Sequence, residues 1–266
     1  MLNEIASKLA SESLLSLYPV IVKNINISFE MNLWSRFFTY AIVSMFFINP
    51  SFIQSNLISF DGILLSVLTM AHVYTSYKGF LLLESGISYT LFYLYPIMIL
   101  LLSGEPVQPI MILSIIGVYL LYSEDKNINK NKDPKGIIMI LLAAFTEALI
   151  YFTVRRLKTT NNWNHIFLSY FPGSLLLTGF LFLFKQIGDF NNLALLSVGL
   201  NGFIGLVGYL LRFFAISRLE PNVYAPLSYF GVIMAYVYGI LINGEHITIT
   251  KVIGSLCIII PNLFIR

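Results

Sequence analysis

Long apolar runs, separated by short polar clusters, dominate the pattern of this chain. Ten runs approach the roughly 20 residues that a helix needs to cross a bilayer. The breaks between them fall at turn-prone clusters such as INPSFIQSN, TTNNWNH and INGEHIT. The pattern predicts an all-α membrane protein with ten transmembrane helices. They are expected at residues 5–23, 33–49, 58–78, 85–103, 107–123, 136–155, 164–184, 191–212, 221–242 and 247–265.

One long polar connector divides the chain nearly in half. It reads SEDKNINKNKDPKG, and five predicted helices lie on each side of it. We therefore expect a first repeat at residues 1–123, a polar linker at 124–135 and a second repeat at 136–266. Because five is odd, the second repeat enters the membrane from the opposite side. This arrangement predicts two inverted five-helix repeats around a central cavity, as in many secondary transporters.

Matching residues in the two halves support this division. A shift of 135 residues, growing to 140 toward the end, pairs Glu12 with Glu147, Lys23 with Lys158, and Gly104-Glu105 with Gly244-Glu245. The matches occur in the same order in both halves, as expected for an internal repeat.

Composition narrows the class of protein further. The 266 residues are 57% hydrophobic and only 11% charged, about half the charge of a soluble domain. The formal net charge of +3 is scattered, so nucleic acid is not an expected partner. The single cysteine, Cys257, cannot form an internal disulfide, and no His/Cys cluster indicates a metal or a cofactor. We expect an integral multi-pass protein of a plasma or inner membrane, in contact with lipid.

The first residues do not resemble a cleavable leader. Glu4, Lys8 and Glu12 interrupt the apolar stretch that such a leader requires. We therefore expect the N-terminus to be retained as part of the first helix.

Several stretches resemble the drug/metabolite transporter superfamily, in its ten-helix form of two EamA-type halves. The strongest is YAPLSYFGVIMAYVYGILINGEHITITKVIGSLCIII, in which Gly244-Glu245 ends a long helix and Gly254 follows nine residues after the glutamate. Lys23 at the end of the first helix and Arg36 in the second are similar to the opening pattern of that family. The resemblance implies alternating access to a central cavity and a cytoplasmic N-terminus. Because the number of predicted spans is even, the C-terminus is then expected on the same side. We expect a small-molecule substrate, protons or a counter-substrate as the coupling partner, and a monomer or homodimer.

Two glutamates inside apolar runs are the main candidates for chemistry. Glu12 and Glu147 each precede a lysine by eleven residues, which is about 16 Å of helix and half of the roughly 30 Å hydrocarbon core. An acidic side chain at this depth costs about 2.5–3.5 kcal/mol, so it usually faces a cavity. We expect both carboxylates to border one cavity and to bind either a proton or a cationic substrate there.

A structural role for these glutamates is the alternative. Lys8 lies one helical turn before Glu12 and could pair with it. Glu147 has no basic residue within a turn, so any partner must come from another helix.

Other polar and aromatic groups lie within the predicted spans. Arg212 and Lys78 would favour an anionic substrate if they point inward, but they could equally reach for the membrane surface. His72 could relay protons or pack as a hydrogen-bonded ring. Tyrosines could line an ammonium site through cation–π contacts. The candidate substrate contacts, besides the two glutamates and Arg212, are Ser16, Tyr151, Tyr89, Tyr93, Tyr224 and Tyr229.

Two transport hypotheses follow from these residues. The first is a secondary active exporter or exchanger of a small organic cation or amino-acid-like metabolite, coupled to protons through Glu12, Glu147 and His72. The second is an anion exchanger resembling nucleotide-sugar or sugar-phosphate carriers. A lipid enzyme is disfavoured, because neither HExxH nor GxSxG occurs in the sequence.

Overall fold

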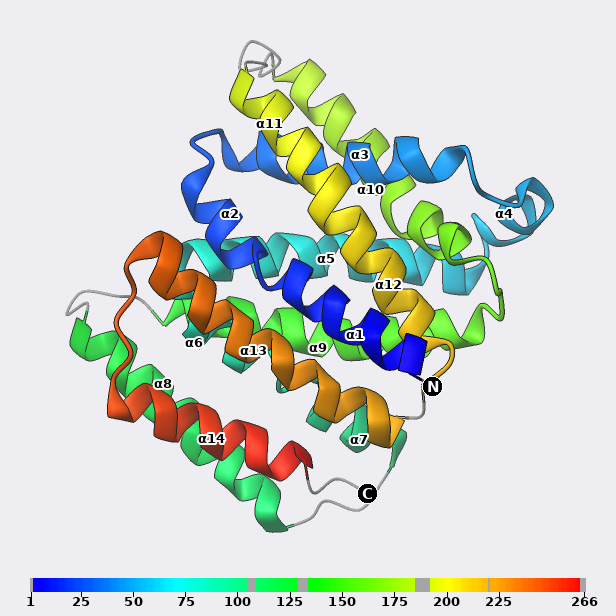
Figure 1. Ribbon diagram of the computed structural model, residues 1–266. Coiled ribbons are helices and arrows are strands. Elements are labelled where there is room, and N and C mark those ends of the chain that lie inside the picture. Colours follow the sequence, from blue (N-terminus) through cyan, green and yellow to red (C-terminus); the bar gives the residue numbers. More distant parts are fainter. Residues whose placement is uncertain (1, 105–108, 129–133, 185–191, 220, 264–266) are drawn as a thin grey trace.

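The computed structural model describes residues 2–104, 109–128, 134–184, 192–219 and 221–263, and every regular element within these ranges is helical (Figure 1). The first half contains α1 (Leu2–Leu15), α2 (Tyr18–Asn24), α3 (Phe29–Met45), α4 (Pro50–Asn56), α5 (Phe60–Leu82), α6 (Ser85–Phe92), α7 (Tyr95–Ser103), η1 (Pro109–Met111) and α8 (Ile112–Ile128). The second contains α9 (Lys135–Arg156), α10 (Asn162–Leu183), α11 (Asn192–Leu200), the π-helix η3 (Asn201–Gly205), α12 (Leu206–Ile216), α13 (Pro221–Asn243) and α14 (Ile249–Leu263).

Five helical stretches of the described residues are long and apolar enough to cross a membrane, or six if the bent pair α4 and α5 counts as one. They are Leu2–Asn24, Ser85–Ser103, Lys135–Arg156, Asn162–Leu183 and Leu195–Ile216. Shorter apolar helices occupy Ile112–Glu124, Leu227–Asn243 and Ile249–Pro261. The chain is an integral membrane protein, and the all-α prediction is confirmed for the described residues. The count of ten spans stays a prediction.

Local chemistry explains where the predicted bounds were wrong. The second span begins at Phe29, four residues earlier than expected, because the Ser28 side chain accepts a hydrogen bond from Met31 N and caps α3. The segment after it was expected to be a break, but Asn49 caps the short helix α4 in the same way. The first span divides into α1 and α2 ahead of Pro19, and the fourth into α6 and α7 ahead of Pro96.

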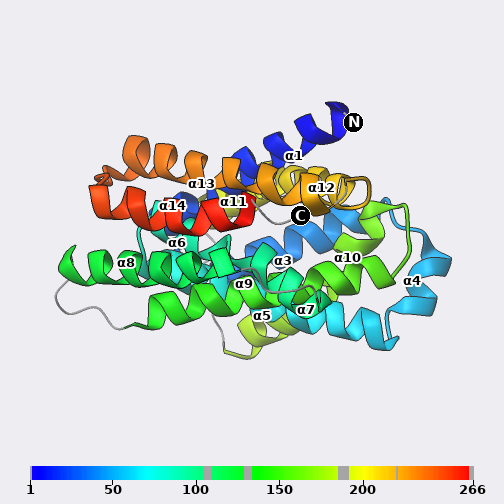
Figure 2. The same cartoon turned by 90° about the horizontal axis from the view of Figure 1, so that it is seen from below.

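The helices pack in antiparallel pairs that join distant parts of the sequence. α5 lies along α9 in the middle of the bundle, α3 lies along α10, and α8 lies along α14 at the edge (Figure 1). α1 crosses the front between α12 and α13. In the view of Figure 2, α13, α14 and α12 lie above α8, α9 and α10. The two halves of the chain are thus interleaved, because each of these pairs takes one helix from each half.

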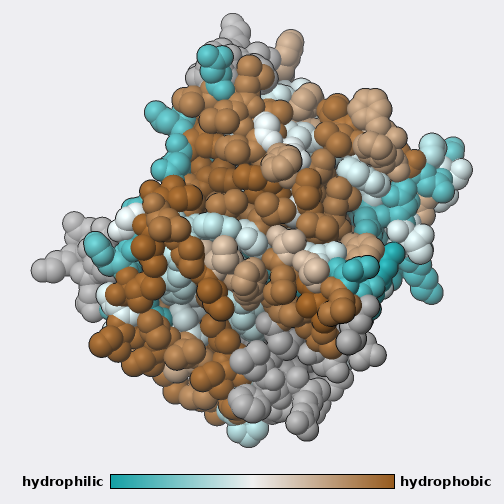
Figure 3. All heavy atoms as spheres, in the orientation of Figure 1, coloured by the Kyte–Doolittle hydropathy of each residue, from teal (hydrophilic) through white to brown (hydrophobic). Residues whose placement is uncertain are grey.

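The outer surface is apolar over most of the face in Figure 3, and polar groups gather at its right and left edges, around α4 and near the turn between α2 and α3. Large apolar side chains are widely exposed, including Phe46, Ile115, Phe182, Phe203 and Leu241. Such a surface matches a bundle whose flanks contact lipid and whose ends contact water.

Ion pairs mark the two ends of the bundle. At one end, which we call the Asp61 end, Arg156 Nη2 at the end of α9 lies 2.8 Å from Asp61 Oδ1 at the start of α5. At the other, the Glu245 end, Lys23 Nζ lies 3.1 Å from Glu245 Oε1. The helices run between these two ends, and the site lies between them.

Candidate functional site

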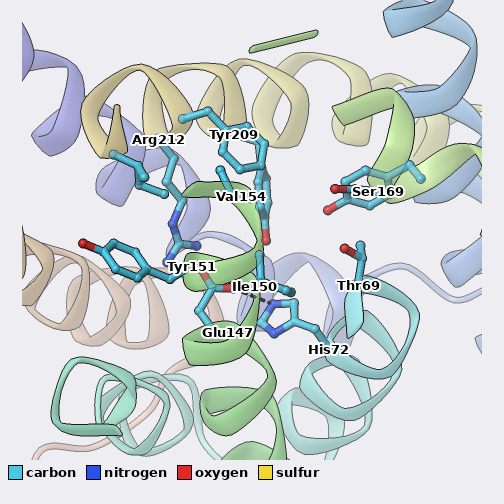
Figure 4. Close-up of a pocket in the computed structure, with 12 residues that line it drawn as sticks. Thr69, His72, Glu147, Ile150, Tyr151, Val154, Ser169, Tyr209 and Arg212 are labelled. Atoms are coloured by element: carbon cyan, nitrogen blue, oxygen red, sulfur yellow. Dashed lines mark ion pairs between the residues drawn. The ribbon is translucent and has the colours of Figure 1, made fainter. Parts of the chain in front are cut away.

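The centre of the candidate site is a buried carboxylate held between two basic groups. Glu147, on α9, lies with its Oε1 2.8 Å from Arg212 Nη2 on α12 and its Oε2 3.6 Å from His72 Nε2 on α5. All three side chains are buried. In Figure 4 the Arg212 guanidinium and the His72 ring point toward Glu147 from opposite sides. The expectation that a partner of Glu147 must come from another helix is confirmed.

Further hydrogen bonds hold the two basic groups in place. His72 Nδ1 lies 3.1 Å from the carbonyl oxygen of Ala143, one turn before Glu147 on α9. The ring therefore contacts α9 twice, at the Ala143 backbone and at the Glu147 side chain. Arg212 Nε donates to the Tyr224 hydroxyl on α13 at 3.3 Å. The centre therefore links α5, α9, α12 and α13.

Glu147 borders a narrow cavity that runs toward the Asp61 end. The cavity lies between α5, α9, α10 and α12 and is lined by Thr69, His72, Glu147, Ile150, Tyr151, Val154, Ser169, Tyr170, Tyr209, Arg212, Phe213 and Ile216 (Figure 4). The space that water can occupy in it is about 20 Å³. One buried water needs roughly 10–15 Å³, so the cavity has room for one or two waters. A metabolite enters only if the helices separate.

A second cavity reaches from the same centre toward the Glu245 end. It is lined by Leu15, Tyr18, Arg36, His72, Ser76, Phe80, Tyr89, Phe92, Tyr209 and Arg212. Its water-accessible space is also about 20 Å³. His72, Tyr209 and Arg212 line both cavities, so these three side chains form the partition between them. We call them the central partition.

The expectation that Glu12 and Glu147 border one shared cavity stays a prediction. Glu12 is fully buried in an ion pair with Lys8, one turn earlier on α1, and Lys8 Nζ lies 3.7 Å from the centre of the Tyr224 ring. Neither cavity described above is lined by Glu12. The local pairing with Lys8, weighed as the alternative, is what the structure contains. A proton-coupling or cation-binding role for Glu12 stays a prediction that these two cavities do not support.

The other predicted contacts divide into two groups. Tyr151 and Tyr89 line the first and second cavity respectively, and Tyr224 holds Arg212. Ser16, Tyr93 and Tyr229 line neither of these cavities. Ser16 Oγ donates to the Ser13 carbonyl at the break between α1 and α2, and the Tyr229 hydroxyl donates to the Tyr93 carbonyl at 3.4 Å. These bonds stabilise helix ends.

Sequence reasoning did not select Arg36 on α3 as a site residue. Its guanidinium is buried and Nη2 donates to the hydroxyls of Tyr170 at 3.0 Å and Tyr209 at 2.8 Å. A signal existed, because Arg36 is an arginine inside an apolar run, but the surrounding tyrosines come from five separate helical segments. They are Tyr18, Tyr40, Tyr77, Tyr170 and Tyr209, whose ring centres lie 4.6–5.7 Å from Arg36 Cζ.

The glycine-glutamate pair after α13 closes the Glu245 end. Gly244 has a φ of +65°, the left-handed conformation that favours glycine, and it turns the chain so that Glu245 reaches α6. Glu245 accepts hydrogen bonds from Ser85 N at 2.8 and 2.9 Å and from Ser85 Oγ at 2.8 Å. Burial alone would raise the pKa of Glu245, but Lys23 and these donors outweigh it and hold the pKa below its ordinary value. The matching Glu105 lies outside the described residues.

No group of three or more His, Cys, Asp and Glu side chains in the described ranges is placed to hold a metal ion. Lys78, considered as an inward anion contact, instead lies with its Nζ 3.7 Å from the centre of the Phe29 ring at the Glu245 end of α5.

Fold and site together define a polytopic helical membrane protein with a charged centre between two narrow cavities. Residues 134–265 match the EamA-like transporter family. This second half belongs to that family, and the resemblance to EamA-type members of the drug/metabolite transporter superfamily is confirmed.

Two further similarities extend this finding. The glucose uptake protein GlcU of Bacillus subtilis (strain 168) is 29% identical over 163 residues, which cover 58% of this chain and 55% of that protein. The match therefore spans about half the length of that relative. A solved crystal structure has a TM-score of 0.65 at 13% identity and covers 97% of this chain and 96% of its own. At this identity the likeness shows a shared fold alone.

Proposed function

We propose that this chain is a secondary transporter that moves a small hydroxylated metabolite, of the size of a monosaccharide, by alternating access through its two cavities. The observation that carries the proposal is the position of Glu147, in the wall of a cavity and between Arg212 and His72. A carboxylate that contacts basic groups on two other helices can couple a change in its protonation to movement of those helices. Protonation of Glu147 would release Arg212 and loosen the central partition.

Hydroxyl-rich substrates fit the cavity walls better than organic cations do. Tyrosine rings offer apolar faces and hydroxyl groups side by side, and Thr69 and Ser169 add two further hydroxyls. Both intramembrane glutamates already have basic partners in Lys8 and Arg212, so a cationic substrate would have to displace one of them. The glucose uptake protein GlcU, by its name, takes up such a molecule.

The ten-helix inverted repeat is part of this proposal. Gly104 and Gly244, the glycines paired by the repeat, both have positive φ, at +77° and +65°. α13 runs toward the end of the bundle where α6 begins, because Asn243 Nδ2 donates to Ser85 Oγ at 3.3 Å. α7 continues α6 away from that end, so the two glycines lie at opposite ends. This placement supports repeats at residues 1–123 and 136–266, joined by the linker 124–135, with opposite orientation.

Proteoliposomes with an imposed pH gradient test the proposal. Uptake of labelled D-glucose, other hexoses, amino acids and amines is compared between the wild type, Glu147→Gln and the control Glu30→Gln, which lies in the first turn of α3. We expect hexose uptake driven by the gradient in the wild type and the control. In Glu147→Gln it falls to the level of empty liposomes, while exchange of labelled for unlabelled hexose persists, since a neutral amide mimics the protonated carboxyl. Full gradient-driven uptake by Glu147→Gln would contradict the role given to this carboxylate.

A further inference from the structure

Arg36 carries a buried positive charge that no carboxylate among the described residues neutralises. It is 2% exposed, and the groups around it are five neutral tyrosine rings rather than an acid. Arg212 and Lys8, the other buried cations near the centre of the bundle, are both paired with glutamates. An unpaired buried charge is costly, so its retention calls for a partner that the protein itself does not supply.

The guanidinium of Arg36 still has bonding capacity. Its two hydrogen bonds to Tyr170 and Tyr209 both come from Nη2, while Nε is buried and makes no hydrogen bond to the described residues. Both protons of Nη2 are used by these two tyrosines, so Nε–H is the donor left to form a charge-assisted hydrogen bond to one oxygen of a carboxylate. Arg36 lines the second cavity, so this capacity lies beside a space that water and ligand groups can enter.

The tyrosine rings around Arg36 are fixed by a polar network. The Tyr18 hydroxyl lies 2.7 Å from the Tyr40 hydroxyl and donates to Asn201 Oδ1 at 2.9 Å. Asn201 is the first residue of the π-helix η3, and such bulges occur often at functional sites. Asn201 Nδ2 in turn donates to Ser35 Oγ at 3.0 Å, next to Arg36 on α3. These hydrogen bonds hold the Tyr18 and Tyr40 rings beside Arg36.

The lining of the second cavity is positive and carries no acid. Arg36 and Arg212 both contribute to it, and its other polar side chains are His72, Ser76 and three tyrosines. Because Glu147 neutralises Arg212, one positive charge remains. A single negative charge balances it, whereas a doubly charged phosphate would leave a charge unmatched in a medium of low dielectric constant.

From this geometry we propose that Arg36 and its tyrosine cage form an anion subsite that receives the carboxylate of a hydroxylated organic acid, such as a sugar acid. The subsite deepens the proposed transport function and rests on it for the entry of a substrate. The hydroxylated part of the ligand extends across the central partition toward Thr69 and Ser169, and the carboxylate lies toward Arg36. Its entry requires the helices around the second cavity to separate.

Binding to the purified full-length chain tests the subsite without depending on transport. The probes are D-gluconate, D-glucose and D-glucose 6-phosphate, read as the shift of the thermal unfolding midpoint with ligand concentration. We expect D-gluconate to bind the wild type at least about tenfold more tightly than D-glucose, since a hydrogen-bonded charge pair contributes that much. Tighter binding of D-glucose 6-phosphate than of D-gluconate would assign the subsite to phosphate instead and overturn the carboxylate assignment.

Substitutions test whether Arg36 is responsible for the preference for D-gluconate over D-glucose. Arg36→Gln is expected to remove the preference for D-gluconate, Arg36→Lys to reduce it, and the exposed-arginine control Arg218→Gln to keep it. If Arg36→Gln does not fold, the ligand series on the wild type still decides, because equal affinity for D-gluconate and D-glucose overturns the subsite. Hexose uptake that D-gluconate does not inhibit would likewise overturn it while leaving the transport proposal intact. Selective binding of D-gluconate with no uptake of any probe would support the subsite and contradict the proposed transport.

Discussion

Glu147 and Arg212 form a buried ion pair of 2.8 Å between α9 and α12, and His72 approaches the same carboxylate from α5 in the other half of the chain. The pair thus lies at the junction of the two halves, where the two cavities meet. An ion pair in this position can stabilise the bundle, couple protons to transport, or do both.

A double substitution separates stability from transport at this pair. Removing one partner of a buried ion pair costs about 3–5 kcal/mol, because the other charge is left without a counter-ion. We expect Glu147→Leu or Arg212→Met alone to lower the thermal unfolding midpoint strongly, and the double variant to recover most of the loss. Transport should remain absent in the double variant. Recovery of uptake together with stability would mean that the pair has only a structural role.

The sequence predicted part of this site and not the rest, for reasons of distance along the chain. Glu147 was identifiable because an isolated acid inside an apolar run needs a partner or a cavity. Its partner Arg212 was also named, but 65 residues separate the two and no periodicity links them. The partner of Glu12 was readable, since Lys8 is one turn away on the same helix. That Glu12 lines neither of the two described cavities depends on tertiary packing, which the sequence does not show.

The same limit applies to the fold. Apolar length predicted the helical segments well, and α9 differs from its predicted range by one residue at each end. Side-chain caps moved other bounds, as at Ser28. The cage around Arg36 was not predictable, because its five tyrosines come from α2, α3, α5, α10 and α12 and meet only after the bundle has packed.

Acid should weaken the Glu245 end of the bundle. The pKa of Glu245 is lowered from its ordinary value of 4.5 by Lys23 and the Ser85 donors, against the opposing effect of burial. A group with a lowered folded-state pKa stabilises the fold above its unfolded-state pKa, and this contribution is lost as the pH falls through the folded-state pKa. We therefore expect the thermal unfolding midpoint to decrease as the pH is lowered below 4.5.

A variant isolates the contribution of Glu245 to this acid response. Glu245→Gln should have a lower unfolding midpoint near neutral pH and a weaker decrease below pH 4.5 than the wild type. Glu84, which pairs with Lys251 at the same end, serves as the comparison through Glu84→Gln. An unchanged acid response in Glu245→Gln would show that other carboxylates are responsible.

The ion pair at the Asp61 end is expected to contribute little. The Arg156 side chain is 50% exposed and the Asp61 side chain 28%, so water and salt screen their attraction. Exposed pairs of this kind typically contribute about 0.2–1 kcal/mol. A double-mutant cycle with Asp61→Asn and Arg156→Gln should give a coupling free energy in this range that decreases with added salt. A larger, salt-independent coupling would indicate that this end is a tightly closed gate.

Gly205 is the position where one methyl group should disturb the Arg36 cage most directly. A Cβ added there would lie 1.8 Å from the Tyr18 hydroxyl and 1.9 Å from the Tyr40 hydroxyl, so both rings must move. Overpacking of this kind costs about 1–3 kcal/mol. We expect Gly205→Ala to lower the unfolding midpoint and to weaken any anion preference of the second cavity, since Tyr18 and Tyr40 both face Arg36.

Gly199 offers a matched control six residues earlier, in α11. An added Cβ there meets no atom within 4 Å, and replacing a helical glycine by alanine stabilises by roughly 0.5–1 kcal/mol. Gly199→Ala should therefore raise the unfolding midpoint slightly and leave ligand binding unchanged. If Gly205→Ala behaves like Gly199→Ala in both measurements, the rings around Arg36 have freedom to shift, and the cage is not the rigid element that the network through Asn201 implies.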